Sequence, residues 1–94
     1  MTEEHDLHAR MKEQQQAILK RLARVEGQVR GIQAMIRRDE DCAAIAQQFS
    51  AARSALDKAY RLMLTCLIEE ALLDPEQSAE QSLLRVREIF TKYT

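Results

Sequence analysis

The apolar residues in the first third of the chain recur with a helical period. Six of them are separated alternately by four and three residues: Ile18, Leu22, Val25, Val29, Ile32 and Ile36. This spacing is the repeat of a left-handed seam between two packed helices. It predicts a first helix that runs from about Leu7 or Arg10 to Arg37.

The same spacing returns in the middle of the chain. Six residues carry it: Ile45, Phe49, Ala52, Leu56, Ala59 and Met63. We expect a second helix from Glu40 to about Leu73, with Asp39 as its N-cap. Because this helix is longer than the first helix can cover, the pattern also favours self-association.

A third helix is predicted near the C-terminus. Asp74 is its expected N-cap, Pro75 its first residue, and Gln77 completes a capping-box pattern. Its apolar stripe consists of Leu83, Val86, Phe90 and Tyr93. No strand-like alternation is present, so the expected fold class is all-α, with a protomer of three helices.

Length and composition favour one soluble helical domain. The chain has 94 residues, which suits a single domain over residues 1–94, with residues 1–9 as a flexible acidic tail. The longest apolar run is too short to cross a membrane. The acidic N-terminus lacks the layout of a signal peptide, so we expect a cytoplasmic protein.

Charge is distributed unevenly along the chain, although the formal net charge is only −1. The region from Arg10 to Arg38 holds two acidic residues, Glu13 and Glu26, and these basic ones: Arg10, Lys12, Lys20, Arg21, Arg24, Arg30, Arg37 and Arg38. In a symmetric oligomer such a helix could repeat into a basic surface for a polyanion. The alternative is an ordinary solvated helix face.

The two cysteines, Cys42 and Cys66, lie 24 residues apart in the predicted second helix. That separation is roughly 36 Å along a straight helix, whereas a disulfide needs Cα atoms about 6 Å apart. The two thiols of one chain therefore cannot meet. They could meet between two copies packed antiparallel, with a crossing point near Ser54.

The chemistry of each cysteine remains open at this level. The N-terminus of a helix would stabilise a Cys42 thiolate, whereas the neighbouring carboxylates would oppose it. Cys66 lies between leucines and could instead be a small buried hydrophobic residue. His5 and His8 could join a metal site or be solvated. No catalytic constellation is visible, so no enzyme is expected.

Two segments carry a resemblance to a known family. LKRLARVEGQVRGI (residues 19–32) and DCAAIAQQFSAARSALDKA (residues 41–59) resemble the copper-, nickel- and formaldehyde-responsive repressors of the CsoR/RcnR/FrmR family, and the likeness extends over about residues 17–93. The resemblance implies a homodimer built on antiparallel second helices, which assembles into a disc-like tetramer. It also implies repression by binding operator DNA until an inducer loads a thiol-centred site.

In such proteins the sensing site joins the cysteine that opens the second helix, here Cys42, to late second-helix residues of the other subunit. The usual histidine and the later cysteine or histidine correspond to Leu67 and Ala71, which cannot bind a metal. Cys66 lies one residue earlier. The resemblance therefore favours persulfide or disulfide chemistry between Cys42 and Cys66, induced by reactive sulfur species.

Other inducers stay possible. Two thiolates could hold Cu(I) linearly, with help from His5 or His8. Formaldehyde-responsive members pair the first cysteine with the amine of an N-terminal proline. Thr2 replaces that proline here, which weakens the aldehyde option but leaves it open.

For DNA contact, the resemblance points to Arg21 and Lys58. Plausible neighbours are Arg24, Gln28, Arg30 and Arg53. Two alternative functions are a helical adaptor that has lost sensing and a small metal carrier.

Overall fold

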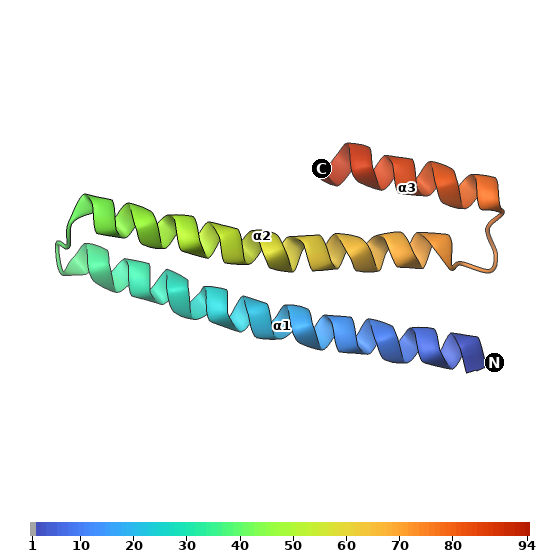
Figure 1. Ribbon diagram of the computed structural model, residues 1–94, viewed down its shortest axis with the longest axis horizontal. Coiled ribbons are helices and arrows are strands. Elements are labelled where there is room, and N and C mark those ends of the chain that lie inside the picture. The colour runs from blue at the N-terminus through green and yellow to red at the C-terminus, as the bar shows by residue number, and fades with distance from the viewer. Residues whose placement is uncertain (1) are drawn as a thin grey trace.

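The computed structural model describes residues 2–94, and side chains from residue 9 onward. It contains three helices, α1 (Thr2–Arg37), α2 (Cys42–Leu72) and α3 (Ala79–Tyr93). α1 and α3 both pack on α2 and run antiparallel to it (Figure 1). The protomer measures 56 × 28 × 13 Å, which is about one helix diameter in its thinnest direction. The all-α, three-helix prediction is confirmed.

α1 begins earlier than predicted. It starts at Thr2 rather than at Leu7 or Arg10, so the backbone that was expected to form a tail is helical. No glycine or proline occurs before Gly27 to interrupt it, and acidic residues near a helix N-terminus are favourable. The side chains of His5 and His8 lie outside the part that the structure describes.

The turn between α1 and α2 differs from the predicted cap. Asp39 is not the N-cap of α2 but ends α1 in a left-handed conformation, with φ of 55°. Its N–H donates to the carbonyl of Ile36 at 3.1 Å, and the N–H of Glu40 donates to that of Met35 at 3.1 Å. These two bonds form a Schellman motif, which satisfies carbonyls at the end of α1. The second helix therefore begins at Cys42, after Asp41.

The start of α3 was also predicted wrongly. The N-cap is Ser78, not Asp74: its hydroxyl accepts from the N–H of Gln81 at 3.1 Å, and the Gln81 side chain accepts from the N–H of Ser78 at 3.0 Å. Asp74 instead accepts from the N–H of Glu76 at 3.0 Å within a turn. Pro75 and Gln77 belong to this connection, so the capping box occurs four residues later than expected.

Each predicted seam is only half buried. The residues that α1 and α2 bury against each other recur every seven positions: Ile18, Val25 and Ile32 on α1, and Ala52, Ala59 and Cys66 on α2. The alternate residues remain exposed: Leu22, Val29 and Ile36 on α1, and Phe49, Leu56 and Met63 on α2. The protomer thus leaves a second apolar stripe without a partner.

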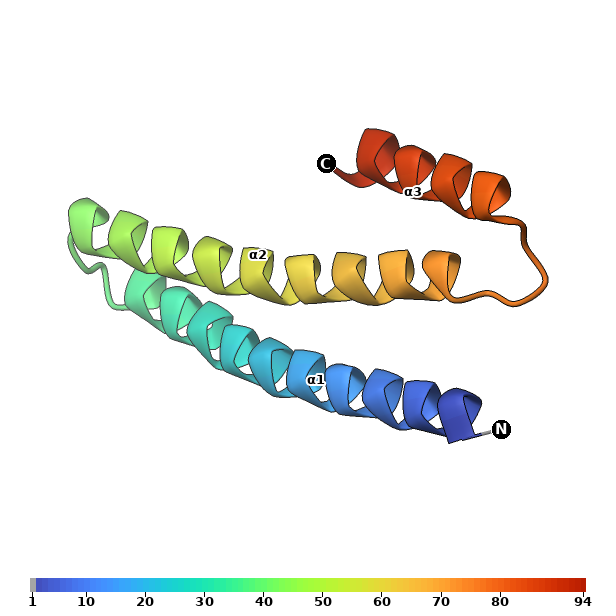
Figure 2. The ribbon, with the colours of Figure 1, turned by 45° about the vertical axis from the view of Figure 1, so that its right-hand side comes forward.

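α3 covers only the C-terminal half of α2, as Figures 1 and 2 both show. Ile89 and Ser82 are its buried residues, and Ala71 of α2 is fully buried. The predicted apolar stripe on α3 is largely uncovered, because Leu83 and Phe90 are exposed and Val86 is half-buried. Among residues 2–94, no helix combines the length and apolar character that crossing a bilayer requires.

Replacing Asp39 with glycine should stabilise the fold. A left-handed conformation costs a residue with a Cβ about 1 kcal/mol or more, and glycine avoids this cost. We expect Asp39→Gly to raise the free energy of unfolding by about 0.5–1 kcal/mol, measured by thermal unfolding at fixed protein concentration. Asp39→Ala, which retains a Cβ, is the control. A destabilised Asp39→Gly would contradict the Schellman assignment.

Candidate functional site

Cys42 is the first residue of α2 and is exposed. The preceding residue, Asp41, makes no side-chain capping bond, so no side chain occupies the N–H groups of the first turn. Of the nearby carboxylates, Glu40 accepts from the guanidinium of Arg38 at 2.9 Å. The thiol is therefore accessible at a helix N-terminus where one acidic neighbour is already paired.

Cys66 lies in a different environment. The residue is only 3% exposed and continues the seven-residue repeat of Ala52 and Ala59 on the face of α2 that packs against α1. Burial raises the pKa of the Cys66 thiol, and the negative charges of Glu70 and Glu69 raise it further. At neutral pH this cysteine keeps its proton, which disfavours nucleophilic attack or metal binding from the closed protomer.

The two cysteines do not meet within the chain. α2 is continuous from Cys42 to Leu72, so the separation of roughly 36 Å expected for a helix applies, as the sequence predicted. In the part of the chain with described side chains, no three His, Cys, Asp or Glu residues gather as metal ligands. Leu67 and Ala71, at the positions usual for ligands, are apolar. A metal would fit these residues only if a second chain supplied donors.

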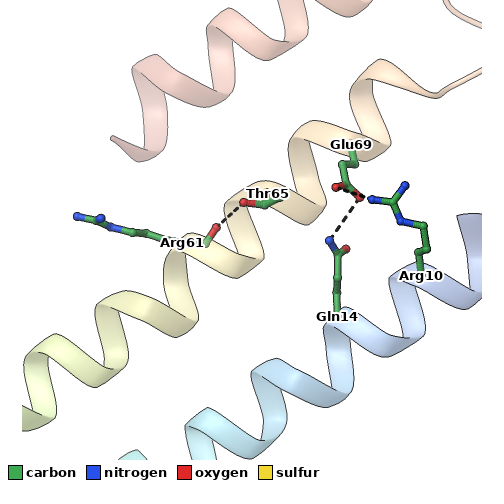
Figure 3. Close-up of polar contacts among 5 residues, drawn as sticks. All are labelled: Arg10, Gln14, Arg61, Thr65 and Glu69. Atoms are coloured by element: carbon green, nitrogen blue, oxygen red, sulfur yellow. Dashed lines mark hydrogen bonds and ion pairs between the residues drawn. The ribbon is translucent and has the colours of Figure 1, made fainter.

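Glu69, one turn beyond Cys66, links α2 to α1. Its carboxylate accepts from the guanidinium of Arg10 at 3.4 Å and from the amide of Gln14 at 3.4 Å (Figure 3). The hydroxyl of Thr65 is not involved, since it donates to the carbonyl of Arg61 at 3.0 Å. The sequence did not single out these contacts, because they depend on the register between the two helices.

The same contact identifies one edge of the α1–α2 hairpin. Arg21 lies eleven residues from Arg10, and Lys58 lies eleven residues from Glu69. Eleven residues make about three helical turns, so Arg21 and Lys58 project from this edge, and Arg24 lies close to it. All three side chains are exposed. Helix geometry therefore places on one edge the two residues to which the family resemblance assigns DNA contact.

Of the remaining predicted DNA-contacting residues, Arg30 and Arg53 lie elsewhere, whereas Gln28, eighteen residues or about five turns from Arg10, lies on the same edge. Arg30 and Arg53 are each about half a turn away from the edge defined by Arg10 and Glu69. Gln28 is half-buried along the seam, and its Oε1 atom is buried without a hydrogen-bond partner.

Comparisons with known proteins agree on one family. A family model described as metal-sensitive transcriptional repressor matches residues 14–92. The copper-sensing transcriptional repressor CsoR of Bacillus subtilis (strain 168) is 36% identical over 89 residues, which cover 93% of this chain and 87% of that protein. The solved structure of the nickel-responsive transcriptional regulator InrS superposes with a TM-score of 0.73 at 31% identity, covering 84% of this chain and 91% of that one.

The contrast between the two thiols is directly measurable. At neutral pH, iodoacetamide should alkylate Cys42 at least about tenfold faster than Cys66, because Cys66 is buried and protonated. Single-cysteine proteins, Cys66→Ala and Cys42→Ala, allow each rate to be followed by intact mass. Because its pKa is raised, labelling of Cys66 should continue to accelerate with pH beyond the ordinary range of thiols. Equal rates for the two thiols would contradict the burial of Cys66.

Proposed function

Because the chain belongs to the metal-sensitive transcriptional repressor family, we propose that it is a cytoplasmic repressor that binds operator DNA and releases it when an inducer engages cysteines of two subunits. Its family consists of regulators, so the chain is not an enzyme. The observation that carries the proposal is the common edge of Arg21 and Lys58 on the hairpin whose second helix bears Cys42 and Cys66.

The basic edge suits DNA without a recognition helix. Exposed arginine and lysine side chains contact phosphates through charge, and such contacts give affinity with a steep salt dependence. Arg21, Arg24 and Lys58 supply three such side chains per protomer. Symmetric copies would repeat them along one surface. We assign Arg30 and Arg53 a smaller role, since they project from the other side.

The exposed apolar residues support an oligomer. Two antiparallel copies that cross near Ser54 would cover the stripe containing Phe49, Leu56 and Met63. A shallow depression beside Leu56 is lined by the small residues Ser50 and Ser54 and by the opposite charges of Arg53 and Asp57, a composition that suits antiparallel self-pairing. The outward residues Leu83 and Phe90 on α3 offer a second patch, consistent with a disc-like tetramer.

Antiparallel pairing would bring each Cys42 close to Cys66 of the partner subunit. A reactive sulfur species fits this site: the Cys42 thiolate attacks a polysulfide and becomes a persulfide, with a shorter polysulfide as the leaving group. Attack by the Cys66 thiolate on the Cys42 sulfur then yields a disulfide and hydrosulfide. Two thiolates could alternatively hold Cu(I). The apolar Leu67 and Ala71 favour the first inducer over metals that need more ligands.

Release of DNA requires that the inducer bind one packing of the helices better than the other. Linking two subunits through Cys66 would act on the seam itself, because this residue packs against α1. A shift of α1 relative to α2 would then separate Arg21 from Lys58. The spacing of phosphate contacts would change with it.

Charge removal on the basic edge should weaken DNA binding. We expect Arg21→Ala and Lys58→Ala each to lower affinity for DNA from upstream of the protein's own gene by about tenfold or more, and to reduce the slope of log K against log salt by about one for each phosphate that is no longer neutralised. Arg30→Ala is the matched control and should change both quantities less. If Arg30→Ala weakens binding as much as Arg21→Ala in gel-shift titrations, the assigned edge is wrong. If the unmodified protein shows no salt-sensitive DNA binding at all, an adaptor or a metal carrier is favoured instead.

The sensing role of Cys42 has its own test. Cys42→Ala should bind operator DNA with unchanged affinity but fail to release it when polysulfide or Cu(I) is added, because one thiol of each inter-subunit pair is missing. Gel shifts with each inducer measure release. In the unmodified protein, mass spectrometry after polysulfide treatment should detect Cys42–Cys66 crosslinks between chains. Normal release by Cys42→Ala would rule out this site.

A further inference from the structure

The first described residues of α1 are held against α2 much less firmly than the rest of that helix. From Ile18 onward, α1 places a buried apolar residue in the seam every seven positions. In residues 9–17, by contrast, only Met11 and Gln14 are even half-buried. Little hydrophobic stabilisation therefore holds this segment in place.

What holds it is Glu69. Among the side chains of residues 9–94, the contacts of Glu69 with Arg10 and Gln14 are the only polar ones between α1 and α2. Both are 3.4 Å long, and the Arg10 side chain is 62% exposed. Exposed ion pairs of this length are weak. In addition, Oε1 of Gln14 is buried without a partner, which makes the closed arrangement less favourable.

The segment ends at the level of the buried thiol. The antiparallel contact of Gln14 with Glu69 places Ile18, one turn further along α1, roughly opposite Cys66, one turn back along α2. The Glu69 carboxylate, which contacts Arg10 and Gln14, is thus only one helical turn from Cys66 along α2. Arg10, its main partner, also lies on the basic edge with Arg21.

We propose that Glu69 is a latch that holds the N-terminal segment of α1, residues 9–17, against α2, so that Ile18 at the end of this segment stays over Cys66, and that the latch must open before Cys66 can react. Glu69 is a positioning residue, because it acts on the thiol through α1. The inference rests on the proposed function in taking Cys66 as part of the sensing site. It adds a gate to that site and a physical link from the thiol to the basic edge.

The cost of opening is confined to the end of the helix. When residues 9–17 leave α2, Ile18 moves with them and uncovers Cys66, whereas Val25 and Ile32 remain packed against Ala59 and Ala52. Local opening of weakly held elements is an ordinary property of folded proteins. Iodoacetamide, which alkylates a thiolate with loss of iodide, reports on how often Cys66 becomes accessible.

The test uses the full chain with Cys42→Ala, so that Cys66 is the only thiol. Adding Arg10→Glu should break the latch and speed labelling of Cys66 by about three- to tenfold. Electrostatics alone would do the reverse, since an extra negative charge near the thiol disfavours the thiolate. Hydrogen exchange should accelerate at the amides of residues 9–17 and stay unchanged around Val25.

A charge swap makes the test specific. Arg10→Glu combined with Glu69→Arg restores an ion pair across the helices and should return hydrogen exchange of residues 9–17 to the parent rate. Hydrogen exchange is the readout for this variant, because a cation beside Cys66 would by itself accelerate labelling. Glu70→Gln is the matched control: it removes a carboxylate near Cys66, but no α1 contact of Glu70 is described. Hydrogen exchange of residues 9–17 should not change in this variant.

Labelling that is unchanged or slower in Arg10→Glu, or hydrogen exchange of residues 9–17 that stays as fast in the charge swap as in Arg10→Glu, would overturn the latch. Neither measurement uses DNA or an inducer. A protein that fails to bind DNA but shows the rescue would therefore retain the latch and lose the proposed function. A protein that binds and releases DNA normally, but in which the charge swap restores nothing, would retain the proposed function and rule out the latch.

Discussion

The packing of large α1 residues against small α2 residues determines the arrangement of this protomer. Ile18, Val25 and Ile32 are buried where α2 presents Cys66, Ala59 and Ala52. Small side chains on one helix let the other approach closely, and their seven-residue spacing repeats the contact along the hairpin. Since this line uses only half of each apolar set, the other half must remain outside. The same packing that buries one half of each apolar set therefore leaves an apolar stripe exposed on the hairpin.

The register of that packing also gives the hairpin two chemically different edges. Arg10 and Glu69 meet across one edge, and Arg21 and Lys58 follow along it at whole numbers of turns. Leu22 and Leu56, which remain exposed, lie more than a quarter of a turn from this edge. One hairpin can thus offer charge to phosphates and apolar surface to a second copy. A change in register would alter both edges together, and this makes the seam a suitable element through which sensing could act.

The sequence was sufficient to predict the three helices and the apolar seams along them. It was not sufficient to predict where the helices end or which residues of each seam are buried. Apolar residues spaced alternately by four and three identify the side of a helix that packs. They do not show which half of the residues is buried within the protomer, because Val25 and Leu22 are both apolar. Residue type makes Asp39 and Asp74 suitable N-caps, yet aspartate also tolerates left-handed backbone and accepts hydrogen bonds in turns, and these are the roles of Asp39 and Asp74 in the structure. Glu69 could not be linked to Arg10 because the contact spans 59 residues. The separation of Cys42 from Cys66 followed from helix geometry alone.

The location of Cys66 in the seam, rather than on the surface, links chemistry to packing. A residue that fills a slot between two helices cannot gain a sulfur atom or a second bond without displacing its neighbours, and overpacking of this kind typically costs about 1–3 kcal/mol. Allosteric coupling energies are of the same size, about 1–3 kcal/mol. An exposed thiol such as Cys42 could accept the same modification with little effect on the helices. In the proposed site, therefore, the exposed cysteine supplies reactivity, and the buried one converts the reaction into a change of helix packing.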